Sequence, residues 1–343
     1  MPALTSSREI RLKSRPHGVP IADNFFMAEV KIPAPAQGEV LVRNLWMSVD
    51  PYMRGRMNEG ASYIPPFELG HPLVGAAIGQ VVASRASGFR EGDYVTSMLG
   101  WREAFTAKAG AVTPLINFVH AMDVPLEMFL GPLGVPGLTS YVSLFRIGKL
   151  LPGERVFISG ASGAVGSFAA IVAKSMGCYV VGTAGDETKR AWLQSELGLD
   201  VALNYRATDF EQSLKNAFPE GIDLYLDNVG GEQLRMALDL MRDFGRIIAS
   251  GMIDQYNDVA PRPGPANLYN IVTRRLRYEG FIVMDHFDLT ETFQRTAAEL
   301  YRSGKLKWVH TAHEGIASAP QALIDLNSGK ASGKSVIRLG SSK

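Results

Sequence analysis

Three glycines at three-residue spacing, Gly160, Gly163 and Gly166, form a segment that could bind a phosphate group. Glycine lets the backbone turn sharply, and the free N–H groups at the start of a helix attract an anion. The short apolar run at residues 156–158 is typical of a buried parallel strand, and helical spacing of apolar residues begins at Val165. This succession of strand, turn and helix predicts a site for the pyrophosphate of a dinucleotide.

The glycine pattern leaves two other interpretations open. Ala161 stands where the strict G-x-G-x-x-G pattern has its first glycine, so the segment could be an ordinary glycine-rich turn. Residues 160–164 also resemble the G-x-S-x-G turn that presents a nucleophilic serine, with Ser162 as the serine and Ala164 in the last position. In so short a loop Ser162 faces a phosphate as easily as solvent. The strand before the turn and the helix after it favour the dinucleotide.

The residues after the second predicted strand indicate which dinucleotide binds. NAD-binding proteins usually place Asp or Glu at the end of that strand, where the carboxylate binds the ribose hydroxyls. Here the strand ends at residues 182–185 without an acid, Asp186 follows, and Lys189 lies one turn further on. Tyr205 ends the next strand. A cation and a phenol suit a 2′-phosphate, which predicts NADP (NADPH) as cofactor. The alternative is that Lys189 is merely solvated at a helix start, with Asp186 as a partner of the helix dipole.

The elements that must position these residues fall into two groups. From residue 138, helices and strands alternate, which predicts a doubly wound parallel sheet and therefore an α/β fold. Its strands are expected at 156–158, 179–182, 200–203, 224–227, 246–250 and 276–283. Residues 1–136 are β-rich, with predicted strands at 39–49 and 73–82 and a turn at 89–95, and they suggest a small barrel-like fold. Short strands return after residue 305 and end at 335–339.

Composition narrows the class of protein. The chain has 343 residues, 46% hydrophobic and 20% charged, which is ordinary for a globular protein of two domains. A net charge of +1 argues against nucleic acid or a charged membrane surface as the main partner. The single cysteine, Cys178, excludes an internal disulfide and is expected to be buried. No apolar run reaches transmembrane length and the N-terminal residues lack the pattern of a signal peptide, so a cytoplasmic location is expected.

The run Ser-Val-Asp-Pro-Tyr-Met-Arg-Gly-Arg-Met at residues 48–57 carries a family resemblance. It looks like the signature of the zinc-independent medium-chain dehydrogenases/reductases, in the branch of leukotriene B4 12-hydroxydehydrogenase/prostaglandin reductase, alkenal double-bond reductase and curcumin reductase. The resemblance extends over nearly the whole chain, including Asp-Asn-Val-Gly-Gly at 227–231. It implies a GroES-like catalytic and substrate domain at 1–136 and 306–343, with a Rossmann NADP-binding domain at 137–305 between them.

The resemblance also implies site residues and a partner. The family's NADP contacts would fall on Gly163, Ala164, Val165, Gly166, Lys189, Tyr205, Asn228, Ser250, Tyr256, Phe281, Ile282 and Val283. Near the C-terminus, Ala331 stands where the family commonly has an Asn before Gly-Lys, so one contact on the nicotinamide side is in doubt. A homodimer would form through strands near residues 276–283.

Zinc chemistry is not expected, although the zinc alcohol dehydrogenases share this architecture. A catalytic zinc needs three protein ligands of Cys, His or carboxylate type. His71 stands where those enzymes carry a histidine, but Asp50 and Pro51 occupy the region where a cysteine ligand would be. His310 and His313 form an H-x-x-H pair, which alone is a weak metal signal. The sequence therefore predicts no metal.

Without zinc, the reaction that the resemblance implies is reduction of a carbon–carbon double bond conjugated to a carbonyl, in an enal or enone. Hydride enters at the β-carbon and the charge appears on oxygen as an enolate, which one or two hydroxyl donors can stabilise. Tyr256 is the first candidate for that donor and Tyr52 the second, with Met53 and Tyr63 as weaker candidates for pocket walls. Alternatively, Tyr256 only covers the cofactor and Tyr52 only packs. The competing functions are an NADPH quinone reductase and a non-catalytic NADPH-binding protein.

Overall fold

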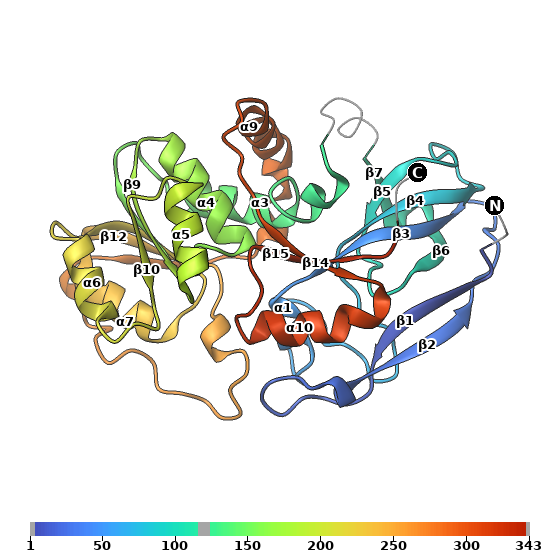
Figure 1. Cartoon of the computed structure of the whole chain (residues 1–343), viewed down its shortest axis with the longest axis horizontal. Helices are drawn as coiled ribbons and strands as arrows, with labels where there is room; N and C mark the ends of the chain where they lie inside the picture. The colour runs from blue at the N-terminus through green and yellow to red at the C-terminus, as the bar shows by residue number, and fades with distance from the viewer. Residues whose placement is uncertain (1–3, 116–123, 341–343) are drawn as a thin grey trace. The chain divides into compact units, whose positions relative to one another are not determined.

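The computed structural model describes residues 4–115 and 124–340 (Figure 1). The chain divides into two compact units. One unit comprises Met1–Leu130 with His310–Lys343, and the other Gly131–Val309. Among the described residues, no helix is both long enough and apolar enough to cross a membrane.

The unit of residues 131–309 is built on a six-stranded parallel sheet, in the order β10-β9-β8-β11-β12-β13. Two successive series of strands therefore run outward from the centre, one from β8 and one from β11, which is the doubly wound arrangement that the sequence predicts. The order reverses between β8 and β11, and ligands of such sheets bind at the carboxyl ends of the strands beside that point. The strands are β8 (Arg155–Ile158), β9 (Tyr179–Ala184), β10 (Val201–Asn204), β11 (Ile222–Asp227), β12 (Met241–Ala249) and β13 (Arg277–Gly280).

Helices connect these strands and cover the sheet (Figure 1). Helix α4 packs against α3, and α3 against α9. Two 3-10 segments, Ile253–Gln255 and Val283–Leu289, follow β12 and β13, and a π-helical turn, Val142–Ile147, follows α3. The helices are α3 (Val135–Tyr141), α4 (Ala164–Ser175), α5 (Glu187–Ser195), α6 (Phe210–Ala217), α7 (Gly231–Leu240), α8 (Asn270–Thr273) and α9 (Thr290–Arg302).

The ends of α4 and α5 follow from their sequences. Gly163 caps the start of α4, and Gly177, at φ +73°, takes the left-handed conformation that commonly follows a helix end. Asp186 caps α5, because its side chain accepts the backbone N–H of Lys189 at 2.9 Å. Cys178 is buried, as predicted.

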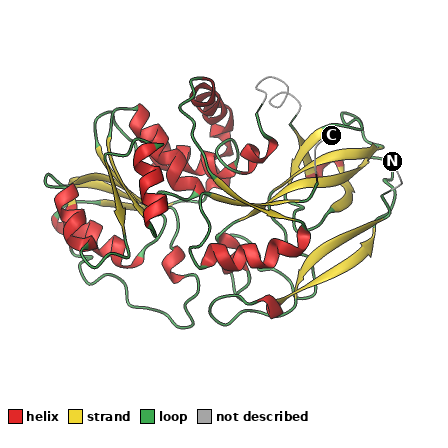
Figure 2. Ribbon diagram, viewed as in Figure 1, coloured by secondary structure: helices red, strands yellow, loops and turns green. Residues whose placement is uncertain are grey.

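The other unit contains a seven-stranded sheet in the order β14-β15-β3-β4-β5-β7, with β6 paired to β3, and a separate two-stranded ribbon of β1 and β2 (Figure 2). Strands β14 and β15 come from the end of the chain, and β15 pairs antiparallel with β3, so the C-terminal residues complete this fold as the resemblance implied. Its strands are β1 (Ser6–Leu12), β2 (Phe25–Lys31), β3 (Glu39–Val49), β4 (Ala77–Ser84), β5 (Tyr94–Ser97), β6 (Ala104–Lys108), β7 (Val112–Pro114), β14 (His310–Glu314) and β15 (Lys334–Arg338).

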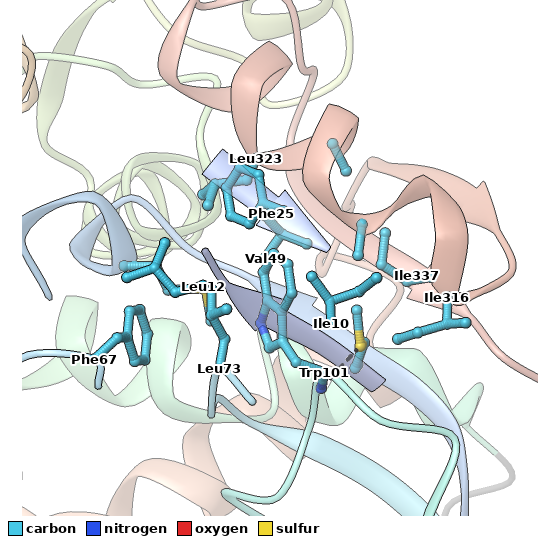
Figure 3. Packing of buried hydrophobic residues seen from close by; sticks show 14 of the residues in the cluster. Ile10, Leu12, Phe25, Val49, Phe67, Leu73, Trp101, Ile316, Leu323 and Ile337 are labelled. Carbon is cyan, nitrogen blue, oxygen red and sulfur yellow. Dashed lines mark hydrogen bonds between the residues drawn. The ribbon is translucent and has the colours of Figure 1, made fainter. Parts of the chain in front are cut away.

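The described residues of this unit form the helices α1 (Tyr52–Arg56) and α10 (Ala319–Asn327), with 3-10 turns at Ala22–Asn24, Ala109–Ala111, Leu126–Leu130 and Ile316–Ser318. Its main core gathers side chains from distant parts of the chain, including Leu12, Trp101 and Leu323 (Figure 3). Trp101 is fully buried and its ring lies parallel to that of Phe25, with ring centroids 6.5 Å apart.

Three predicted elements were wrong in extent or type. Strand β13 ends at Gly280, whereas the apolar run predicts a strand as far as Val283; the chain leaves the sheet there and enters the 3-10 segment. The region after residue 305 contains helix α10 as well as strands, because Ala319, Ala322 and Leu323 repeat at helical spacing and are buried. Strand β4 begins at Ala77 rather than at residue 73.

Candidate active site

The glycine turn lies between β8 and α4, at the reversal point of the parallel sheet. Gly160 has φ +60°, and a Cβ atom on Gly166 would lie 2.5 Å from the carbonyl oxygen of Gly160. Only glycine allows this close approach of the helix start to the turn. Ala161, at the irregular position of the pattern, is buried, and a Cβ on Gly182 would lie 2.6 Å from its side chain. The missing glycine is therefore compensated by Gly182 on the neighbouring strand.

The start of α4 presents backbone donors to a ligand. Gly163 has extended geometry as the cap, and Ala164, Val165 and Gly166 form the first turn. The N–H groups of a first turn have no partner within their own helix, and a helix of this length carries a partial positive charge there. A helix start of this kind can bind an anion such as a pyrophosphate.

The residues predicted to bind the 2′-phosphate of NADP lie after β9 and β10. The Nζ of Lys189 is 3.2 Å from the carboxylate of Asp186, and the Lys189 side chain is largely buried. Tyr205 follows β10 and donates its backbone N–H to Ala184 at 3.2 Å. A Cβ on Gly185 would lie 3.0 Å from the Tyr205 hydroxyl, so the phenol lies over the turn that leads into α5. The structure thus brings Lys189 and Tyr205 to the same corner of the sheet.

Arg206 belongs to the same corner, although the sequence did not single it out. Its guanidinium lies 5.5 Å from the centroid of the Tyr205 ring. Its charge and that of Lys189 both lower the pKa of Asp186, after the larger effect of the Lys189 backbone N–H. Arg206 follows Tyr205 directly in the chain, and this adjacency is the signal that could have found it.

The turn between β11 and α7 carries Asn228. Its side-chain amide donates to the carbonyl of Ser159 at 2.8 Å, and its backbone N–H donates to the Ser159 hydroxyl at 2.9 Å. Asn228 is therefore fixed against the end of β8. Two glycines with positive φ, Gly230 at +76° and Gly231 at +56°, then lead into α7. A turn of this kind needs the conformational freedom of glycine.

A cavity of about 560 Å³ lies beyond the carboxyl ends of β12 and β13. Tyr256 contributes to its wall, and the Tyr256 hydroxyl accepts the backbone N–H of Met252 at 3.5 Å. Burial raises the pKa of the Tyr256 hydroxyl above the usual value for tyrosine, so the hydroxyl remains a hydrogen-bond donor at neutral pH and above. The lining residues are Ala249, Ser250, Gly251, Met252, Tyr256, Gly280, Phe281, Ile282 and Asp285.

Four predicted residues therefore meet at this cavity: Ser250, Tyr256, Phe281 and Ile282. Val283, also predicted as a cofactor contact, begins the following 3-10 segment and is not among the lining residues. Met252 and Asp285 were missed by the sequence interpretation. The sequence predicts that β13 extends to Val283. Because β13 ends at Gly280 instead, Asp285 lies in the segment that lines the cavity.

The remaining predicted site residues belong to the other unit. Tyr52 begins α1, and burial, with a smaller effect of the Asp50 charge, raises the pKa of its hydroxyl. Tyr63 is exposed. Met53, suggested as a pocket wall, is fully buried in the core of its unit. Arg56 holds its guanidinium 4.1 Å from the centroid of the Phe67 ring.

Known proteins resemble this chain over its whole length. The NADP(+)-dependent 2-alkenal reductase of Nicotiana tabacum is 39% identical, over 97% of this chain and 97% of that protein. The NADPH-dependent curcumin reductase of Escherichia coli (strain K12) is 36% identical, over 96% of this chain and 95% of that protein. The crystal structure of CurA from Vibrio vulnificus, in complex with NADPH, superposes with a TM-score of 0.91 at 33% identity, covering 98% of this chain and 100% of that one. The chain belongs to the zinc-independent medium-chain dehydrogenase/reductase family.

Two family models match parts of the chain. One, described as the N-terminal domain of oxidoreductase, matches residues 8–115, and one described as zinc-binding dehydrogenase matches residues 164–302. Despite that second description, the residues that the structure describes contain no group of three or more His, Cys, Asp or Glu side chains that could hold a metal ion. Cys178, within the matched segment, is buried and contacts the carbonyl of Leu151 at 3.5 Å. His71, in the other unit, is exposed and pairs with Glu68.

The residues present fit the NADP cofactor of this family. The absence of a side chain at Gly166 lets the start of α4 pack directly against the carbonyl of Gly160, and the N–H groups of such a helix start can bind a pyrophosphate. Lys189, Tyr205 and Arg206 form a corner with two cations, where an NAD-binding protein would place a carboxylate for the ribose hydroxyls. Asp186, the acid that follows β9, is engaged in capping α5 and in its pair with Lys189.

Proposed function

We propose that this protein uses NADPH to reduce the carbon–carbon double bond of α,β-unsaturated aldehydes and ketones. The observation that carries the proposal is the position of Tyr256. Its protonated hydroxyl lies in the wall of a cavity at the same edge of the parallel sheet as the glycine turn. A phenol in this position can donate to an oxygen on which negative charge develops. The family relatives named above are reductases of alkenals and of curcumin.

The cofactor is held by three groups of residues in this proposal. Ala164, Val165 and Gly166 bind the pyrophosphate through backbone N–H groups at the start of α4, and Gly163, whose own N–H donates to Gly160 at 3.0 Å, caps that start. Lys189 and Tyr205 bind the 2′-phosphate, with Arg206 adding a second positive charge. The nicotinamide end binds at the cavity lined by Ser250, Tyr256, Phe281 and Ile282. Asn228 and Val283, which do not line it, are included as contacts because the family resemblance implies them.

When bound, the reduced nicotinamide supplies the hydride that enters at the β-carbon of the substrate. The electron pair of the double bond then moves toward the carbonyl oxygen, and the Tyr256 hydroxyl stabilises that oxygen by donating a hydrogen bond. The α-carbon takes a proton from solvent or from a phenol, which completes the saturated carbonyl product. The apolar side chains of Met252, Phe281 and Ile282 restrict water around the reacting carbons.

Tyr52 is the second candidate for the donor. Its hydroxyl is kept protonated by burial and by the charge of Asp50, and the Arg56 side chain is a hydrogen-bond partner of its oxygen. Tyr63 interacts electrostatically with both Tyr52 and Arg56. In this proposal residues 1–136 and 306–343 form the catalytic and substrate domain, and residues 137–305 the NADP-binding domain.

A homodimer forms through the edge of the parallel sheet in the same proposal. Strand β13 is the last strand of the sheet order, so one side of its backbone has no neighbouring strand within the described chain. An unpaired edge of this kind is a template for a second strand. Two copies of β13 that pair about a two-fold axis would join the two sheets into one.

The proposal is tested with a panel of enals and enones and with NADPH that carries deuterium at the transferred position. We expect consumption of NADPH, a saturated aldehyde or ketone as product, and deuterium at the β-carbon. Faster turnover of quinones than of any enal or enone would indicate an NADPH quinone reductase instead. Tight NADPH binding without oxidation by any substrate of the panel would indicate a non-catalytic NADPH-binding protein.

A further inference from the structure

Asp227, the last residue of β11, is a fully buried acid with an unusual distribution of hydrogen bonds. Its Oδ1 accepts four donors: the Tyr225 hydroxyl at 2.7 Å, the Gly230 N–H at 2.8 Å, the Val229 N–H at 3.0 Å and the Ser159 hydroxyl at 3.1 Å. Its Oδ2 is buried and has no hydrogen-bond partner among the described residues. One carboxylate oxygen therefore carries all the contacts of this side chain.

These contacts shape the turn that follows β11. The N–H groups of Val229 and Gly230 both point back to Oδ1, which closes the chain around the carboxylate. Gly230, at φ +76°, supplies the left-handed conformation that this closure requires. Burial raises the pKa of Asp227, and the hydrogen bonds from the four donors offset part of that effect.

The turn at residues 227–229 also holds in place the segment that carries Tyr256. The carbonyl of Asp227 accepts the N–H of Ser250 at 2.9 Å and that of Gly251 at 3.1 Å. The next two carbonyls of the turn, at residues 228 and 229, accept the N–H groups of Ile253 at 3.4 Å and of Asp254 at 3.2 Å. Tyr256 lies two residues after Asp254 and donates its own N–H to the carbonyl of Ile253 at 3.4 Å. Four successive contacts thus tie the wall of the cavity to the 227–229 backbone.

We propose that Asp227 is a positioning residue of the active site, which sets the place of the Tyr256 hydroxyl by fixing the carbonyls of residues 227–229. It acts through the backbone and does not contact the substrate. The inference rests on the proposed function only in so far as Tyr256 is the donor to the substrate oxygen. The ordering of residues 250–256 by Asp227 is independent of that role and can be measured without cofactor or substrate.

The test perturbs the carboxylate through one of its donors. Tyr225→Phe removes the hydroxyl that donates to Oδ1 and keeps the ring, which stacks on Phe157 with centroids 4.7 Å apart. The matched control is Tyr179→Phe, which removes a hydroxyl that donates to the carbonyl of Ala217 at 3.1 Å and packs against the same core. Ser159→Ala, which removes a second donor to Oδ1, is the companion variant if Tyr225→Phe does not fold.

The first readout is amide hydrogen exchange of the cofactor-free protein. We expect peptides covering residues 250–256 to exchange about tenfold faster in Tyr225→Phe, the scale of one lost hydrogen bond to a charged acceptor, and not in Tyr179→Phe. Peptides of β8 should remain as protected as in the parent. Unchanged exchange at 250–256, or equally faster exchange throughout the sheet, would show that Asp227 is only a structural acid and would overturn the inference.

The second readout is turnover in a double-mutant cycle with Tyr256→Phe. We expect Tyr225→Phe to lower kcat about tenfold in the parent and to have little further effect in Tyr256→Phe, because both changes disable the same donor. Fully additive effects on kcat, with exchange changed as expected, would overturn the link from Asp227 to Tyr256. If Tyr256→Phe alone retains the parent kcat while the exchange result holds, the donor assignment fails and the ordering of residues 250–256 by Asp227 stands.

Discussion

The ammonium of Lys189 lies 3.2 Å from the carboxylate of Asp186, and the backbone N–H of Lys189 bonds the same side chain at 2.9 Å. Asp186 is thereby both the cap of α5 and the counter-ion of Lys189. Of the two interpretations of this lysine, solvation at a helix start is not supported, because its side chain is largely buried. The pair places a cation beside Tyr205 and Arg206 while neutralising an acid that would repel a phosphate.

Lys189→Ala should weaken NADPH binding and leave NADH binding nearly unchanged. The loss should be about 1.5–3 kcal/mol, the scale of a hydrogen bond to a charged group. That is about one to two decades in Kd, measured by fluorescence titration. Lys174→Ala is the control. It removes a lysine that pairs with Asp200 at 2.8 Å and lies in the last turn of α4, away from the glycine turn where α4 begins. An equal loss of affinity for the two cofactors would contradict the 2′-phosphate assignment.

Gly166→Ala should destabilise the unit of residues 131–309 and weaken NADPH binding. The added Cβ would lie 2.5 Å from the carbonyl oxygen of Gly160 and 2.7 Å from the Cα of Ala161, and both are backbone atoms that move only if the turn opens. Overpacking of this kind costs about 1–3 kcal/mol. Gly264→Ala is the control, because its nearest neighbour is a Leu268 side-chain carbon at 4.0 Å. Equal melting temperatures for the two variants would show that the turn tolerates a side chain.

The fold could be predicted where the determinants are local. The spacing of Gly160, Gly163 and Gly166, between an apolar strand and an apolar helix, fixes the geometry of β8 and α4 with little help from the rest of the chain. Similarly, Glu39–Val49 is a long run of strand formers, and its predicted limits are those of β3. The family resemblance added the return of the C-terminal strands to the N-terminal fold, which no local pattern contains.

The site was less predictable because its geometry depends on contacts between distant residues. Phe281 and Ile282 continue the apolar run of β13, and only the structure shows that they leave the sheet and line a cavity. Asp227 is one acid within a glycine-rich motif, and its four hydrogen-bond donors come from the residue after β8, from β11 and from the turn that follows β11. The position of the Arg206 guanidinium over Tyr205 likewise depends on side-chain conformation.

Proline substitutions in β13 should show whether the proposed dimer can be disrupted without unfolding the protein. Successive residues of a parallel strand direct their N–H groups to opposite sides, so of Tyr278 and Glu279 one faces β12 and the other faces the open edge. We expect one of Tyr278→Pro and Glu279→Pro to yield a monomer of 37.3 kDa with a nearly unchanged melting temperature, and the other to destabilise the sheet. Sedimentation measures the first effect. A parent protein that sediments as a monomer, or two variants that both stay dimeric, would contradict pairing through this edge.

Activity should not depend on a metal ion. Asp50, which occupies the region of the expected cysteine ligand, accepts the Ser48 hydroxyl and pairs with the buried ammonium of Lys334 at 3.1 Å, so its carboxylate is already engaged. Dialysis against a chelator should leave NADPH oxidation with an enone unchanged. Loss of activity that zinc restores would contradict this prediction, and the metal content of the active protein provides an independent measurement.

Tyr256→Phe should lower turnover without a comparable loss of NADPH affinity. The substitution keeps the ring in the wall of the cavity and removes only the hydroxyl, which accepts the Met252 N–H at 3.5 Å. Loss of one preorganised oxyanion donor costs about 10²–10³ in kcat where it has been measured. A role shared with Tyr52 would reduce the effect, so we expect a decrease of about tenfold or more. Tyr269→Phe, at an exposed tyrosine of the same unit outside the cavity lining, is the control and should turn over at the parent rate.

The pH profile and a second variant distinguish the possible donors. Burial raises the pKa of Tyr256, so its proton-donating form should persist above the pKa of an ordinary tyrosine, about 10, and kcat should not fall as pH rises toward that value. The parent kcat could instead begin to decrease at a pH well under 10 while kcat of Tyr256→Phe does not. That result would show that the Tyr256 phenol titrates and is not held protonated by burial. If Tyr256→Phe has the parent rate while Tyr52→Phe is impaired, the donor belongs to the unit that contains α1. If neither substitution matters, the enolate is protonated and stabilised without a tyrosine, and the cavity at β12 and β13 only binds the cofactor.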